Sequence, residues 1–197
     1  MRCDEPRLIH ALRLPAGQPV TVRPVCPQDS DALQAYVRAL SPDARYKRFF
    51  GPLRELPPAE LDRVIHLHHR NRLALIAEAR LDGASIVIGE ARYALAPDRL
   101  NCELAVSVAD GWRGKGLGTL LLGDVERRAR SLGARHLVGD VLRTNEAMQA
   151  LARNAGFAMA DGPGDAKLVR IVKDLGRPAR TALPCEVSAA SGLAQAA

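Results

Sequence analysis

Long hydrophobic stretches are missing from this chain of 197 residues. No apolar run reaches the roughly 18 residues that a membrane-spanning helix needs. The first residues, Met-Arg-Cys-Asp-Glu-Pro, lack the apolar core that follows the charged start of a secretory signal. We therefore expect no membrane partner and a cytoplasmic location.

Cysteine is also scarce. The cysteines are scattered, without a Cys-x-x-Cys pair that would suggest zinc or a redox dithiol, at Cys3, Cys26, Cys102 and Cys185. Three histidines lie close together, but without a carboxylate or cysteine set on a matching face, at His66, His68 and His69. We expect reduced thiols and no metal.

Aromatic residues make up only 4% of the sequence, whereas the formal net charge at pH 7 is +6. A basic surface attracts polyphosphate ligands and nucleic acids alike. Basic residues are densest, without an aromatic ladder or a recognition-helix pattern, around Arg38, Arg45, Lys47, Arg48 and Arg54. We therefore expect no nucleic-acid partner.

Length and composition predict one globular domain. A chain of this length with 47% hydrophobic residues can bury a sizeable core. Residues 1–17 have no clear period and contain Pro6 and Pro15, so we predict a loose arm. Residues 176–197 are rich in alanine and serine, so we predict a disordered tail. The domain is then expected over residues 18–175.

Hydrophobic periodicity predicts both strands and helices. Apolar runs predict strands over residues 20–25, 73–81, 86–95, 101–108, 136–142, 157–160 and 167–175. Helical spacing predicts helices that begin at Asp29 or Ser30, at Pro57 or Pro58, at Leu117 and at Asn145. Asp82-Gly83 is a strong hairpin signal. The basic stretch between the first two helices is expected to be rich in loops.

The most informative segment is residues 111–119, Gly-Trp-Arg-Gly-Lys-Gly-Leu-Gly-Thr, between a predicted strand and a predicted helix. Three glycines at alternate positions leave the main chain bare, so several N–H groups can point into one concavity. At the N-terminus of a helix, such groups favour an anion. We therefore predict a phosphate-binding loop.

Two familiar glycine-rich loops do not fit. A mononucleotide P-loop needs a serine or threonine after Gly-Lys, but Gly116 follows Lys115. A dinucleotide fingerprint needs its third glycine one position later than Gly118, where Thr119 stands.

The segment Arg113-Gly114-Lys115-Gly116-Leu117-Gly118 instead has the form Arg/Gln-x-x-Gly-x-Gly/Ala. It resembles the acyl-coenzyme A pyrophosphate loop of the GNAT superfamily of N-acetyltransferases. Residues 101–108 resemble that family's fourth strand, and residues 141–157 resemble its fifth strand, last helix and glycine-aromatic step. Residues 20–25 and 41–50 resemble the bacterial GNAT domains that acetylate protein lysines.

This resemblance implies an α+β fold, in which a twisted, mostly antiparallel sheet of six to seven strands is flanked by about four helices. The strands over residues 101–108 and 136–142 are expected to splay apart and to admit acetyl-coenzyme A (acetyl-CoA) as cosubstrate. The implied contacts of its pantetheine and pyrophosphate are Val106, Ser107, Val108, Arg113, Gly114, Lys115, Gly116, Leu117, Gly118 and Thr119. Asn145 is implied as a further contact, although it is equally suited to cap its helix.

Acetyl transfer to a lysine needs a base, because an amine with a pKa near 10.4 is protonated at neutral pH. The resemblance assigns this role to Glu103. Its apolar neighbours Leu104 and Val106 are expected to desolvate the carboxylate, which suits general-base chemistry. Where family members often have a tyrosine that protonates the departing thiolate, this chain has Ala152. Water, or a hydroxyl such as that of Ser107, is a candidate substitute, and the acid stays unassigned.

The expected function is acetyl transfer from acetyl-CoA to a primary amine, with a protein lysine as the leading acceptor. A small-molecule amine is the alternative acceptor. Because Ala152 replaces the expected acid, a non-catalytic module that senses acyl-CoA also remains open.

Overall fold

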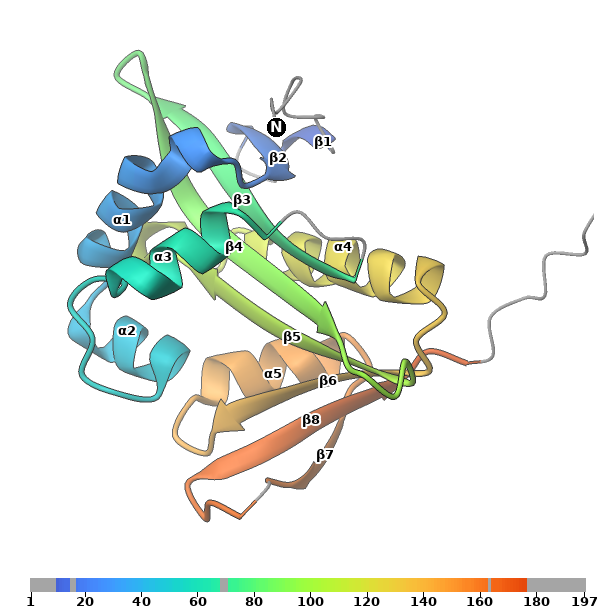
Figure 1. Cartoon of the computed structure of the whole chain (residues 1–197). Helices are drawn as coiled ribbons and strands as arrows, with labels where there is room; N and C mark the ends of the chain where they lie inside the picture. Colours follow the sequence, from blue (N-terminus) through green and yellow to red (C-terminus); the bar gives the residue numbers. More distant parts are fainter. Residues whose placement is uncertain (1–9, 15–16, 68–70, 163, 177–197) are drawn as a thin grey trace, which may run out of the picture.

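The computed structural model describes residues 10–14, 17–67, 71–162 and 164–176. In these residues, eight strands form one sheet in the order β1-β2-β3-β4-β5-β6-β8-β7, and five α-helices pack against it (Figure 1). Every neighbouring pair is antiparallel except β5 and β6, which are parallel. The α+β class predicted from the sequence is confirmed.

The first part of the sheet is an antiparallel meander. It consists of β1 (His10–Arg13), β2 (Pro19–Pro24), β3 (Arg72–Leu81), β4 (Ala84–Leu95) and β5 (Asn101–Val108). The second part consists of β6 (His136–Leu142), β8 (Leu168–Asp174) and β7 (Ala158–Asp161). The predicted hairpin turn between β3 and β4 is confirmed.

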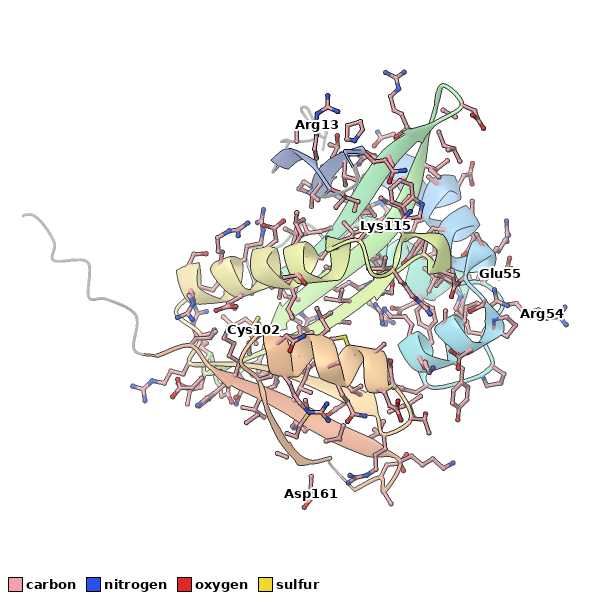
Figure 2. The ribbon with its side chains drawn as sticks, turned by 180° about the vertical axis from the view of Figure 1, so that it is seen from behind. Arg13, Arg54, Glu55, Cys102, Lys115 and Asp161 are labelled. Atoms are coloured by element: carbon pink, nitrogen blue, oxygen red, sulfur yellow. The ribbon has the colours of Figure 1, made fainter. Side chains whose placement is uncertain are left out.

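Helices cover both faces of the sheet. One face carries α1 (Ser30–Ala39), α2 (Pro42–Phe49) and α3 (Pro58–Ile65), and the other carries α4 (Leu117–Ser131) and α5 (Glu146–Asn154). Figure 2, seen from behind, shows α4 and α5 lying across the strands. Each face buries its own apolar cluster, which is the main source of stability for such a layered domain. None of the described helices is long and apolar enough to cross a membrane.

The sequence pattern predicts neither β1 nor α2. His10–Arg13 lies in the predicted loose arm, yet it pairs with β2 from His10 opposite Val22 to Arg13 opposite Pro19. Pro42–Phe49 lies in the predicted loop, yet it forms a helix that Ser41 caps. Of its residues only Ala44 is buried, so the helix needs few apolar residues and its sequence shows little helical period. The rest of the predicted arm, apart from residues 14 and 17, and residues 177–197 of the predicted tail lie outside the described residues.

The parallel pair β5 and β6 is short. Their register covers only Asn101 opposite His136 through Glu103 opposite Val138. Beyond Glu103, β5 continues to Val108 beside β4 alone. The predicted splay between these two strands is confirmed, and it leaves one edge of β5 available to a ligand.

Candidate active site

The glycine-rich loop leads directly into α4. Gly114 and Gly116 have φ angles of 72° and 84°, in the left-handed region that glycine adopts most readily. Gly116 is the N-cap residue, and within the described chain no side chain caps this helix. Its first N–H groups therefore remain available to an anion, as the loop pattern predicts. Figure 2 labels Lys115 beside this helix start.

A cavity of about 560 Å³, here called the loop cavity, opens between this loop, the end of β5, α2 and α5. Nine of the predicted coenzyme contacts line it: Val106, Ser107, Val108, Arg113, Gly114, Gly116, Gly118, Thr119 and Asn145. The fold therefore brings together residues that are spread over 40 positions of the sequence. Contact with a coenzyme remains a prediction for each of them.

Two predicted contacts, Lys115 and Leu117, do not line the loop cavity. Leu117 is 0% exposed and belongs to the core between the sheet and α4. The Nζ of Lys115 lies 4.9 Å from the ring centroid of Trp112, a cation–π contact on the side of the loop. Their side chains serve packing and loop shape, and the prediction for these two residues is limited to their main-chain amides.

Asn145 caps α5. Its Oδ1 accepts a hydrogen bond from the N–H of Met148 at 3.2 Å. The capping role is confirmed, and Asn145 also lines the loop cavity, so one residue ends the turn after β6 and faces the predicted ligand.

A second cavity of about 220 Å³, here called the splay cavity, lies where β5 and β6 separate. Glu103 lines it together with Asp140 of β6 and Arg170 of β8. The two cavities share the lining residues Lys47, Arg48, Val106, Asn145 and Met148. A ligand in one cavity can therefore meet a ligand in the other beside Val106.

Glu103 is exposed, so the expected desolvation of its carboxylate is wrong. Glu103 is the last residue of β5 that pairs with β6, opposite Val138, and it lines the splay cavity. Arg170 donates to both oxygens of Asp140, at 2.8 and 2.9 Å. The pKa of Arg170 is raised mainly by this hydrogen bonding, and the nearby charge of Glu103 adds to the effect. A cation is thus held opposite the Glu103 carboxylate.

A fully buried carboxylate lies behind the cavities. Glu90 of β4 is 0% exposed and accepts hydrogen bonds from Arg48 at 2.8 Å and from Arg92 at 3.1 Å. Burial acts to raise the pKa of Glu90, but the charges and hydrogen bonds of Arg92 and Arg48 outweigh it and lower the pKa to about 2. Glu90 is therefore an anion that holds Arg48 against both cavities. Sequence reasoning missed this group, although a Glu-x-Arg pair within an apolar strand was its signal.

The glycine-rich loop is also tied to α2. Asp110 accepts hydrogen bonds from the N–H of Ser41 at 2.9 Å and from its hydroxyl at 3.0 Å. Arg113 forms an ion pair with the same carboxylate at 3.1 Å. The N-terminus of α2 therefore stands in a fixed relation to the predicted pyrophosphate site.

No group of three potential metal ligands occurs among the described side chains. His66 contacts Asp62 instead, with Nδ1 3.1 Å from a carboxylate oxygen. His68 and His69 lie outside the described residues.

Residues 35–157, more than half of the chain, match the acetyltransferase (GNAT) family. The chain belongs to this family. The relationship agrees with the loop, the splayed strands and the cavity beside them, and it confirms the resemblance seen in the sequence.

Individual relatives support the same conclusion. Acetyltransferase PA5475 of Pseudomonas aeruginosa is 31% identical over 153 residues, which cover 78% of this chain and 82% of that protein. The crystal structure of the GNAT domain of S. lividans PAT is similar with a TM-score of 0.76 at 25% identity, over 84% of this chain and 96% of that domain. The structure of yncA, a putative acetyltransferase from Salmonella typhimurium with its cofactor acetyl-CoA, has a TM-score of 0.64 at 19% identity. The similarity covers 82% of this chain and 98% of yncA. That last likeness shows the shared fold.

By its family, this GNAT protein is an acetyl-CoA-dependent N-acyltransferase. The loop cavity lies beside the glycine-rich loop at the start of α4.

Proposed function

We propose that this GNAT enzyme transfers the acetyl group of acetyl-CoA to the ε-amine of a protein lysine. The observation that carries the proposal is the meeting of the two cavities beside Val106, with Glu103 in the smaller one. In this proposal the donor occupies the loop cavity and the lysine side chain enters the splay cavity.

On the donor side, main-chain N–H groups between Arg113 and Thr119 bind the pyrophosphate at the start of α4. The pantetheine follows the edge of β5 that β6 leaves unpaired, as an additional strand would. A main-chain amide near Val106 then polarises the thioester carbonyl and stabilises the charge that develops on its oxygen.

On the acceptor side, Glu103 accepts the proton that the lysine ammonium must lose, directly or through a water. Because the carboxylate is exposed, solvent can take up the proton afterwards. Arg170, held by Asp140, keeps a positive charge near Glu103.

The size of the splay cavity favours a protein lysine over a small-molecule amine. Its volume of about 220 Å³ is below the range of roughly 300–1,000 Å³ that is usual for small-molecule sites. A lysine needs room only for a narrow aliphatic chain, since its peptide stays outside. Tyr46 and Phe50 are 42% and 44% exposed, and Phe50 lines the splay cavity, so they offer apolar surface to such a peptide.

The test combines isotopically labelled acetyl-CoA with lysine-containing proteins, polyamines and cell lysate, and measures thiol release and the position of the label by mass spectrometry. We expect label on protein lysines. Glu103→Gln should lower kcat/KM by about 10²- to 10⁴-fold, the usual contribution of a general base, while the affinity for acetyl-CoA is retained.

Glu55→Gln makes the same chemical change at an exposed glutamate outside both cavities and should leave turnover unchanged. Label on polyamines alone would show a small-molecule acceptor. Binding of acetyl-CoA without turnover on any acceptor would instead identify a sensing module.

A further inference from the structure

Two hydroxyl groups lie in contact at the wall of the loop cavity. Ser107, on β5, lines the cavity, and its Oγ is 2.9 Å from the Oη of Tyr36 on α1. Tyr36 is only 3% exposed. Ser107 therefore faces the cavity, and Tyr36 supports it from the protein interior.

Ala152, at the position where family members often have a tyrosine that acts as the acid, does not lie at the loop cavity. Ala152 is 0% exposed, packs in the core cluster and is not among the residues that line the loop cavity. Of the described residues that line the loop cavity, Ser107 and Thr119 carry hydroxyls. Thr119 lies in the first turn of α4, whereas Ser107 adjoins Val106, where the two cavities meet.

The direction of the hydrogen bond between the two hydroxyls follows from burial. In the described part of the chain, Ser107 Oγ is the partner of Tyr36 Oη. Either hydroxyl could be the donor at this distance; because a buried hydroxyl hydrogen needs an acceptor, we assign Tyr36 as the donor to Ser107. Burial raises the pKa of Tyr36, which keeps the phenol a neutral donor among the charges of Glu90, Arg48 and Arg113. The Ser107 hydrogen is then free to point into the cavity.

We propose that the Ser107 hydroxyl donates a hydrogen bond to the sulfur of coenzyme A as it departs, and that Tyr36 is a positioning residue that orients this hydroxyl. The inference rests on the proposed function. As the amine nitrogen bonds to the acetyl carbon, the carbon–sulfur bond breaks and its electron pair moves to sulfur. The proton lost by the amine goes to Glu103 or to water.

Ser107 acts by hydrogen bonding and keeps its own proton. A thiol has a pKa near 8.5, so a thiolate is a weaker base than a serine alkoxide and cannot take the proton of Ser107. A preorganised donor nevertheless stabilises the charge that accumulates on sulfur, and the thiolate is protonated by solvent after it leaves. This chemistry needs no acidic side chain at position 152.

The decisive measurement needs no acceptor. Coenzyme A is bound to the full chain, and the ultraviolet absorbance of its thiolate is followed against pH. A hydrogen bond to a charged group should lower the pKa of the bound thiol by about one pH unit relative to the variant without the hydroxyl. Ser107→Thr and Ser107→Val have nearly the same shape, so only the valine variant should lose this effect.

Turnover gives the second measurement. Ser107→Val should lower kcat by about 10- to 100-fold with the affinity for acetyl-CoA preserved, and Ser107→Thr should restore most of the loss. Tyr36→Phe should lower kcat by about 2- to 10-fold in the wild type and have no further effect in the Ser107→Val background. Tyr93→Phe removes a hydroxyl from another buried tyrosine, in the core cluster beneath α4, and should leave kcat unchanged.

The proposal is overturned if Ser107→Val binds coenzyme A and the bound thiol titrates as in the wild type. The role of Tyr36 is overturned if its effect on kcat is the same with and without Ser107. Because the thiol titration is independent of the acceptor, failure to find an acetylated lysine would count against the proposed function alone.

Discussion

At the scale of single residues, Gly118 lines the loop cavity and lies at the contact between α4 and α5. A Cβ at Gly118 would lie 3.1 Å from Leu151 Cδ2 and 3.9 Å from Val108 Cγ2. Leu151 and Val108 both line the loop cavity. A side chain at this position must therefore displace the Leu151 methyl group, which helps to shape the loop cavity.

We predict that Gly118→Ala weakens acetyl-CoA binding by about tenfold, equivalent to about 1.4 kcal/mol, measured by titration calorimetry. Gly123→Ala, in the same helix, is the matched control. Among the described side chains, a Cβ at Gly123 would meet Arg127 Nη1 at 3.9 Å, an ordinary contact. Gly123→Ala should stabilise the fold by about 0.5–1 kcal/mol, because alanine has a higher helix propensity than glycine. Its affinity for acetyl-CoA should be unchanged. Equal affinities for the two variants would contradict the prediction.

Residue identity alone could not assign every role. The sequence predicts Asn145 equally as a cap and as a ligand contact, and the structure confirms the cap. It predicts a desolvated Glu103, yet the side chain is exposed at the residue where the pairing of β5 with β6 ends. The environment of a side chain depends on strands that no local pattern positions.

At the scale of elements, α2 links the two cavities. It supplies Lys47 and Arg48 to both of them, and Ser41 anchors its N-terminus. The Ser41 hydroxyl accepts from the N–H of Ala44 at 3.2 Å and donates to Asp110 at 3.0 Å. The position of α2 therefore depends on one side chain that caps the helix and connects it to the glycine-rich loop.

Ser41→Ala should destabilise the protein by about 1 kcal/mol, the usual cost of a lost N-cap, measured by urea unfolding. It should also raise KM for the acceptor, since the wall of the splay cavity that α2 forms loosens. Ser131→Ala, at the exposed end of α4, removes only a bond to the carbonyl of Arg128. That control should change stability by less than about 0.5 kcal/mol. A Ser41 variant as stable as the Ser131 variant would show that the cap does not hold α2.

Elements with a strong apolar period were predictable, and α2 was not. The helix α4 buries six residues at helical spacing, so its sequence indicates its structure: Leu117, Leu121, Leu122, Asp124, Val125 and Ala129. In α2 only Ala44 is buried, and the helix depends on Ser41 and on contacts with distant segments. The helix α1 begins at Ser30 with Asp29 as its N-cap residue, as predicted, but the carboxylate of Asp29 binds Arg23, at 2.6 and 2.7 Å.

At the scale of the whole molecule, buried ion pairs determine how stability depends on pH. The pKa of Glu90 in the folded state, about 2, is below the ordinary glutamate value near 4.3. A depressed pKa contributes stability that is present above about pH 4.5 and is lost as the pH falls toward 2. Asp29, Asp110 and Glu126 also have lowered pKa values and act in the same direction.

We predict that the free energy of unfolding falls steadily between about pH 4.5 and pH 2. Glu90→Gln should cost about 3–5 kcal/mol at pH 7, because Arg48 and Arg92 are left without their buried counter-charge. The difference between the two proteins should shrink below pH 4.5, which urea unfolding at pH 7 and pH 3 measures. An equal difference at both pH values would show that the Glu90 charge is not the source of the stability.

The sequence by itself determined the glycine-rich loop and the helix that follows it, and its resemblance to the GNAT superfamily implied the splayed strands. The loop and the helix depend on local glycine spacing and hydrophobic period, which neighbouring residues impose on each other. Only the tertiary structure decided that Ser107 meets Tyr36, that Glu90 lies between Arg48 and Arg92, and that α2 closes both cavities. Those relations join segments far apart in the chain, and they form only when burial of both faces of the sheet brings the segments together.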